Sequence, residues 1–182
     1  MAEDNKLEEF PTQKLEKILD HFEPGCRFME KLEIGDESAR GYFRLPAKPY
    51  HVKQAMQYAT FSELSHCIEQ LTYAAFSHWL EGSKIKNFDI PFLDFVKVMN
   101  LGLVQIMRIR EGEFLDEIER RNDRPIVCDL KLTKVLGRYG TACVAYVDYF
   151  FEDGRARGSL EFGIGLHKAE IDRNHRRNSR RQ

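Results

Sequence analysis

The sequence has few of the features that mark several large protein classes. All of its apolar runs are far shorter than the roughly 20 residues that a membrane-spanning helix needs. Residues 1–9 are acidic and polar, unlike a secretory signal peptide. It has no Gly-x-Ser-x-Gly motif, which argues against an α/β-hydrolase, and no Gly-rich phosphate loop. We therefore expect no membrane span.

Cysteine and histidine are also sparse and unpatterned. The 4 cysteines show no Cys-x-x-Cys spacing, and none of the 6 histidines forms a ligand pair at helical spacing with a carboxylate. We interpret the cysteines as reduced core residues, which is typical of a cytoplasmic protein. No metal and no cofactor are predicted. The cysteines are Cys26, Cys67, Cys128 and Cys143.

Charge is plentiful but nearly balanced, with a net charge of -1 over 182 residues. With 42% hydrophobic residues, the length suits one domain with a sizeable core. The balance does not indicate a nucleic-acid partner. Residues 167–182 carry six basic and two acidic side chains and no aromatic residue, as a solvated tail would. We predict a flexible segment over 1–11, a domain over 12–166 and a basic, disordered tail over 167–182.

Periodicity divides the domain into helices and strands. Helical spacing predicts a short helix over 13–22, a long helix over 61–80 and a further helix from 91 to 100. Alternation predicts a hairpin of strands over 26–34 and 39–45. The remaining segments read as strands over 101–110, 126–135, 142–151 and 156–166, with a charged helix or excursion over 113–121.

Strands that surround one long helix favour an α+β fold rather than alternating βαβ units. A curved antiparallel sheet wrapped around a single central helix is the hotdog architecture. The pattern also fits other α+β sheets, so periodicity alone leaves the choice open.

The long helix carries a polar stripe without lysine or arginine. The residues at steps of three and four are Glu63, His66, Gln70, Tyr73 and Ser77. A solvated face of an amphipathic helix would explain such a stripe. A solvated face usually shows more charge, however, and Glu63 stands in the first turn, where the helix dipole favours an acid.

Residues 61–76, FSELSHCIEQLTYAAF, resemble the central-helix segment of FcoT-like fatty acyl-CoA thioesterases, which have the hotdog fold. The similarity extends more weakly over residues 28–166. The matching features are Glu63, Cys67, Gln70-Leu71-x-Tyr73, Ala75-Phe76, Cys128-Asp129-Leu130 and Pro49-Tyr50.

The resemblance implies hydrolysis of a long-chain acyl thioester on coenzyme A or an acyl carrier protein, with Tyr50 and Tyr73 lining the site. Hydrolysis needs a polarised carbonyl, an activated water and a dry acyl chain. Backbone amides at the start of the helix can polarise the carbonyl. Glu63 and His66 can activate water. Substrate contacts are expected from Phe61, Ser62, Gln70 and Glu69.

The chain departs from the family where the family has asparagines. Thr60 or Phe61 stands near the first of them, and Glu69 stands at the second. An ionised glutamate cannot donate to a carbonyl as an asparagine does. Three other functions therefore stay open: glycine addition to a 2-enoyl carrier thioester, dehydration of a 3-hydroxyacyl thioester, and acyl binding without catalysis. Dehydration would use His51, which follows Pro49-Tyr50.

The architecture also predicts an assembly. Lone hotdog domains pair so that two sheets become one, so a homodimer or a multiple of dimers is expected. The aromatic run over 146–151 is a candidate for a shared sheet surface or for the acyl tunnel, or it faces its own core.

Overall fold

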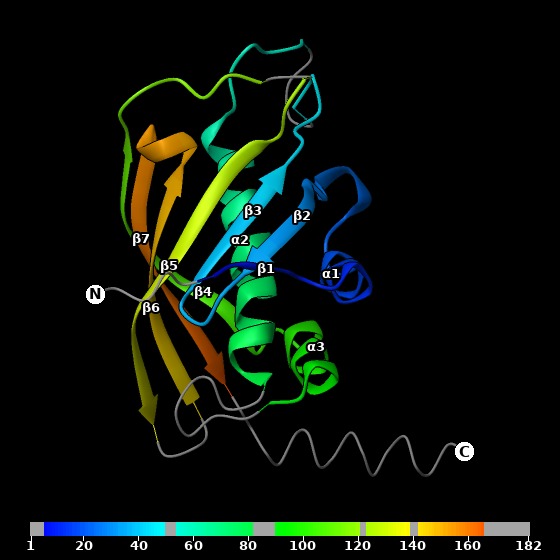
Figure 1. Ribbon diagram of the computed structural model, residues 1–182, viewed down its shortest axis with the longest axis vertical. Coiled ribbons are helices and arrows are strands. Elements are labelled where there is room, and N and C mark those ends of the chain that lie inside the picture. Colours follow the sequence, from blue (N-terminus) through cyan, green and yellow to red (C-terminus); the bar gives the residue numbers. More distant parts are fainter. Residues whose placement is uncertain (1–5, 50–53, 82–89, 121–122, 139–141, 166–182) are drawn as a thin grey trace.

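A computed structural model describes residues 6–49, 54–81, 90–120, 123–138 and 142–165. Within them, seven strands form one antiparallel sheet and three α-helices pack with it (Figure 1). The strands are β1 (Glu8–Glu9), β2 (Met29–Ile34), β3 (Ser38–Phe43), β4 (Val104–Phe114), β5 (Ile126–Arg138), β6 (Ala142–Phe151) and β7 (Ala156–Gly165). The helices are α1 (Thr12–Leu19), α2 (Phe61–Trp79) and α3 (Phe92–Asn100).

The sheet order is β1-β2-β3-β5-β6-β7-β4, so the strand that follows the helices returns to the far edge of the sheet. The sheet curves around α2, and α1 and α3 pack against the same helix (Figure 1). The two edges are unequal, since β1 has 2 residues and β4 has 11. A curved antiparallel sheet around one long helix is the hotdog fold, as predicted.

Strand alternation buries one face of the sheet against α2. Along β6, the buried side chains are Cys143, Ala145, Val147, Tyr149 and Phe151, two residues apart. The aromatic run over 146–151 is therefore divided between the two faces of the sheet. Tyr149 and Phe151 belong to the core, and Tyr146 and Phe150 lie on the outer face.

The helices of the sequence prediction are confirmed with small shifts. α2 begins and ends within one residue of the prediction, and α3 begins after Pro91. α1 ends three residues early, and its N-cap is Pro11 rather than Thr12. Residues 115–120 form an irregular excursion between β4 and β5 instead of a helix.

β2 differs from its predicted phase. Glu30 was expected to share a face with Leu32, but Glu30 is exposed and Leu32 is fully buried. The register of β2 against β3 shifts between Met29 and Lys31, and this bulge reverses the side-chain direction before it.

The domain includes part of the N-terminal segment that was expected to be flexible. Glu8 and Glu9 pair with β2, and Phe10 is buried with its amide bonded to Leu32 O at 2.9 Å. In the described part of the chain, no helix has the length and apolar character needed to span a bilayer.

Candidate active site

The first turn of α2 is fixed by a reciprocal cap. Thr60 is the N-cap, and its hydroxyl accepts from the Glu63 amide at 3.4 Å. Glu63 Oε2 in turn accepts from the Thr60 amide at 3.0 Å and from the Thr60 hydroxyl at 2.8 Å. The sequence Thr-x-x-Glu gives this arrangement because the third residue of the helix can reach back to the cap.

Arg120 completes the environment of Glu63. Its Nη2 forms an ion pair with Glu63 Oε2, and the two side chains are 5% and 0% exposed. The same guanidinium donates to Tyr58 O at 2.9 Å and to Pro46 O at 2.5 Å. Glu63 Oε1 finds no donor among the described residues. Glu63 is thus mainly a cap and an ion-pair partner, with one oxygen remaining.

The side chain of Gln70 forms hydrogen bonds with the backbone that leads into β2. Its Oε1 accepts from the amides of Phe28 and Met29, each at 3.0 Å, and its Nε2 donates to Cys26 O at 2.5 Å. The residue is 0% exposed. We therefore assign to Gln70 a structural role in place of the substrate contact that the sequence suggested.

A second group of polar side chains lies on the neighbouring side of α2. His66 Nδ1 lies 3.6 Å from Glu69 Oε2, and these side chains are 29% and 33% exposed. Tyr73 is buried, and its hydroxyl donates to Val104 O at 3.3 Å. Burial, and then the charge of Glu69, raise the pKa of Tyr73 well above its ordinary range, so the phenol stays protonated.

The single predicted stripe is therefore two. Each helical residue turns about 100° around the axis, so a step of three residues places His66 about 60° around the helix from Glu63. Glu63, Gln70 and Ser77 point into the protein, and all are fully buried. His66 and Glu69 lie on the side that solvent reaches.

This accessible side of α2 contacts segments near both ends of the sheet. Near β2, the ring of His66 meets that of Phe28 edge-on, with the ring centroids 6.2 Å apart. Near β4, the hydroxyl of Tyr73 donates to the backbone oxygen of Val104. At the first turn of α2, the ring centroids of Phe61 and Phe114 lie 6.0 Å apart.

The inner face of β4 carries apolar side chains that remain exposed. Ile109 pairs with Leu160 and Phe114 pairs with Ala156, and both partners are core residues, so these side chains face inward. They are nevertheless 38% and 49% exposed, and Phe61 is 54% exposed. An apolar wall beside a polar helix face suits a ligand with an acyl chain and a reactive polar group.

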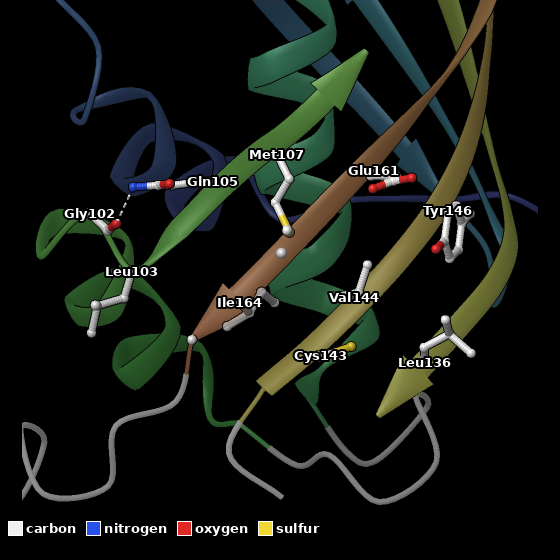
Figure 2. Close-up of a pocket in the computed structure, with 12 residues that line it drawn as sticks. Gly102, Leu103, Gln105, Met107, Leu136, Cys143, Val144, Tyr146, Glu161 and Ile164 are labelled. Carbon is white, nitrogen blue, oxygen red and sulfur yellow. Dashed lines mark hydrogen bonds between the residues drawn. The ribbon is translucent and has the colours of Figure 1, made fainter. Parts of the chain in front are cut away.

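A pocket of about 610 Å³ lies elsewhere, on the outer face of the sheet (Figure 2). Met107, Val144 and Leu136 project into it on the side away from α2. Met107 lies across Gly163, which pairs with Val144. This pocket is therefore separate from the helix residues that the sequence singled out.

The predicted site residues are thus only partly brought together. Phe61, Ser62, His66 and Glu69 share the accessible side of α2, and Tyr73, one turn after Glu69, is buried. Glu63 and Gln70 lie on the buried side. Tyr50 and His51 lie outside the described residues. Arg120 was missed, because it stands in a charged run that resembles an ordinary surface segment. Among the described residues, no cluster of three His, Cys, Asp or Glu is arranged to hold a metal ion.

No protein-family model matches the chain, and no curated protein matches it. Solved structures do. The dehydratase domain from the CurJ module of curacin polyketide synthase aligns over 89% of this chain and 50% of that chain, with a TM-score of 0.51 and 13% identity. A thioesterase from Haemophilus influenzae covers 75% of this chain and 80% of its own, with a TM-score of 0.44 and 14% identity. AziG of S. sahachiroi covers 76% and 90%, with a TM-score of 0.42 and 15% identity.

The likeness to the dehydratase domain agrees with the class of fold that the sheet and α2 define, which is the hotdog fold. Identities of 13–15% do not carry a substrate or a reaction from those proteins to this chain. The similarity to FcoT-like thioesterases stays a resemblance of the helix segment.

Proposed function

We propose that the chain is a thioesterase that hydrolyses long-chain fatty acyl thioesters of coenzyme A or of an acyl carrier protein. The observation that carries this proposal is the pair His66 and Glu69, 3.6 Å apart, on the accessible side of an otherwise buried helix. An imidazole beside a carboxylate is suited to general base catalysis near neutral pH.

In this mechanism His66 accepts a proton from water, and Glu69 stabilises the imidazolium that forms. The hydroxide adds to the thioester carbonyl and gives a tetrahedral intermediate. Its collapse breaks the carbon–sulfur bond, and the departing thiolate takes the proton from His66. The products are a fatty acid and a thiol, and no cofactor is required.

The start of α2 is the proposed site for the carbonyl oxygen. Amides of a first helical turn have no partner inside the helix and lie at the positive end of the dipole. Helical side chains tilt towards the N-terminus, so His66 leans back over the turn that contains Ser62. Glu63 holds this turn in place. Its Oε1, which has no donor among the residues that the structure describes, is the atom through which it could orient a water.

We further propose that a second copy completes the site. β4 is an edge strand of 11 residues, and its inner face carries the exposed Ile109 and Phe114. Pairing of β4 with its counterpart would satisfy the edge and cover these apolar side chains. The acyl chain would then lie between the inner face of β4 and the partner, away from water.

A cytoplasmic location is part of the proposal. Its support is chemical: all four cysteines are free, and Cys67, Cys128 and Cys143 are buried. Unpaired thiols suit a reducing compartment.

The test is turnover of a series of saturated acyl-CoA and acyl-carrier substrates, followed by thiol release. His66→Asn should lower kcat about a hundredfold or more, the usual contribution of a positioned base. His78→Asn is the matched control, because His78 is a half-buried histidine on the far end of the same helix. An equal loss in both variants would argue against the assigned base.

The same protein should be incubated with a 3-hydroxyacyl-CoA and with a 2-enoyl carrier thioester plus glycine. The likeness to a dehydratase domain makes dehydration the second candidate, since an imidazole and a carboxylate also serve that reaction. Water loss or glycine addition without thiol release would replace hydrolysis. Binding without any turnover would leave an acyl-binding domain.

A further inference from the structure

Arg120 is buried in a way that the surface arginines are not. Its side chain is 5% exposed, whereas the ion-paired Arg40, Arg124 and Arg157 keep 41%, 48% and 54%. A buried guanidinium is costly unless it is paired, and here each of its three nitrogens donates a hydrogen bond. Its three nitrogens reach three separate segments of the chain through Pro46, Tyr58 and Glu63.

Backbone contacts join the same segments. Ala59 N donates to Ile118 O at 2.8 Å, and Arg120 N donates to Gln57 O at 2.8 Å. Tyr58 and Glu119 form an isolated bridge. The excursion after β4 is thus tied to the strand-like segment that enters the N-cap of α2.

The excursion is anchored at its other side as well. The amides of Leu115 and Asp116 donate to Arg155 O at 2.8 and 3.1 Å. Arg155 is the residue that follows the turn between β6 and β7. The excursion that carries Arg120 therefore connects the first turn of α2 to the turn between β6 and β7.

We infer that Arg120 is a positioning residue of the acyl-thioester site: through Glu63 it fixes the first turn of α2, and with it the amides that receive the carbonyl. This inference rests on the proposed function. Arg120 does not touch the substrate in this arrangement, because its side chain is buried and forms an ion pair with Glu63. A small displacement of a preorganised site is enough to slow catalysis strongly.

The experiment compares Arg120→Gln and Arg120→Lys with Arg124→Gln, which removes an exposed arginine paired to Glu152. Arg120→Gln should lower kcat about tenfold to a hundredfold with little change in KM, because the ground state depends less on the carbonyl geometry. Arg120→Lys keeps the charge but not the contacts with all three segments, so its kcat should lie between those of the wild type and Arg120→Gln. Arg124→Gln should retain wild-type kcat.

A double variant shows whether Arg120 acts through Glu63. Glu63→Gln with Arg120→Gln should lose no more activity than the worse single variant, since both break one link. Multiplied losses would overturn the inference. So would wild-type kcat in folded Arg120→Gln, or in Arg120→Lys if the glutamine variant does not fold.

Amide hydrogen exchange separates this inference from the proposed function. In either Arg120 variant that folds, exchange should speed up over residues 60–64 and stay unchanged over 71–79. Unchanged exchange at 60–64 would overturn the inference. A wild type that hydrolyses no thioester would end the thioesterase proposal, while the exchange result would still decide whether Arg120 positions this turn.

Discussion

At the scale of single residues, the buried side of α2 depends on hydrogen bonds that cannot be replaced by water. Gln70→Met keeps the length of the side chain but removes its bonds to Cys26, Phe28 and Met29. Because three backbone groups lose their partner, we expect the free energy of unfolding to fall by about 3 kcal/mol. Chemical denaturation of purified protein measures this change.

The control is Gln105→Met, which removes one exposed bond to Gly102 O at 2.8 Å. Surface changes of this kind stay within about 0.5 kcal/mol. If Gln70→Met were as stable as Gln105→Met, the buried amide would not be structural.

The sequence could predict which residues of α2 are polar, but not which of them are accessible to a substrate. Spacing placed Glu63 and His66 on one stripe, and the structure separates them because Glu63 has a partner 57 residues away. Nothing local to Glu63 indicates Arg120. His66 and Glu69 were both candidates, but only their exposure makes them the accessible pair.

At the scale of elements, β4 and β7 approach too closely for a side chain at Gly158. A Cβ there would lie 2.0 Å from Glu111 O and 2.4 Å from the hydroxyl of Tyr149. Gly158→Ala must push the strands apart, so we expect it to destabilise by about 1–3 kcal/mol. Thermal melting followed by circular dichroism measures it, with Gly25→Ala as control, because a Cβ at Gly25 meets nothing within 4 Å.

The exposed edge of β4 is the element that should control assembly. Ile109→Lys places a charge on its inner face, and a buried lysine without a partner is strongly disfavoured. We expect this variant to shift towards monomer and to lose turnover together with the dimer. Analytical ultracentrifugation decides this. Leu136→Lys, on an exposed residue of the outer face, should keep the assembly of the wild type.

The sequence predicted the helices and strands better than it predicted the site or the strand order. A long helix has strong periodicity, so α2 was found within one residue. β2 ends where it was predicted but begins three residues later, at Met29. Its phase was wrong before Leu32, because a bulge depends on pairing with β3 and leaves no local pattern.

At the scale of the whole molecule, several buried groups keep their protons when the chain folds. Burial raises the pKa of Cys143 to about 11, and it raises the pKa of Cys67 and Cys128 well above the ordinary value of 9.0. Above pH 9 the unfolded chain releases these protons and the native chain holds them. The free energy of unfolding should therefore be steady below pH 9 and fall as the pH rises from 9 through 11.

Denaturant midpoints between pH 7 and 11 test this alkaline loss. Cys143→Ala should reduce the slope, because it removes one of the groups that titrate only on unfolding. A midpoint independent of pH up to 11 would contradict the burial of these thiols.

The overall architecture followed from one long helix among strands, yet the strand order did not. That β4 closes the far side of the sheet, beside β7, is set by how the curved sheet wraps α2.

The two edges of the sheet differ in length, and this difference limits how copies of the chain can assemble. One edge ends in the two residues of β1, which cover only part of β2, and the other edge is the eleven-residue β4. In the pairing proposed above, two copies join through β4 about a two-fold axis, so neither copy keeps its long edge free. Such a pair would be closed and would not extend through β4 into a fibre.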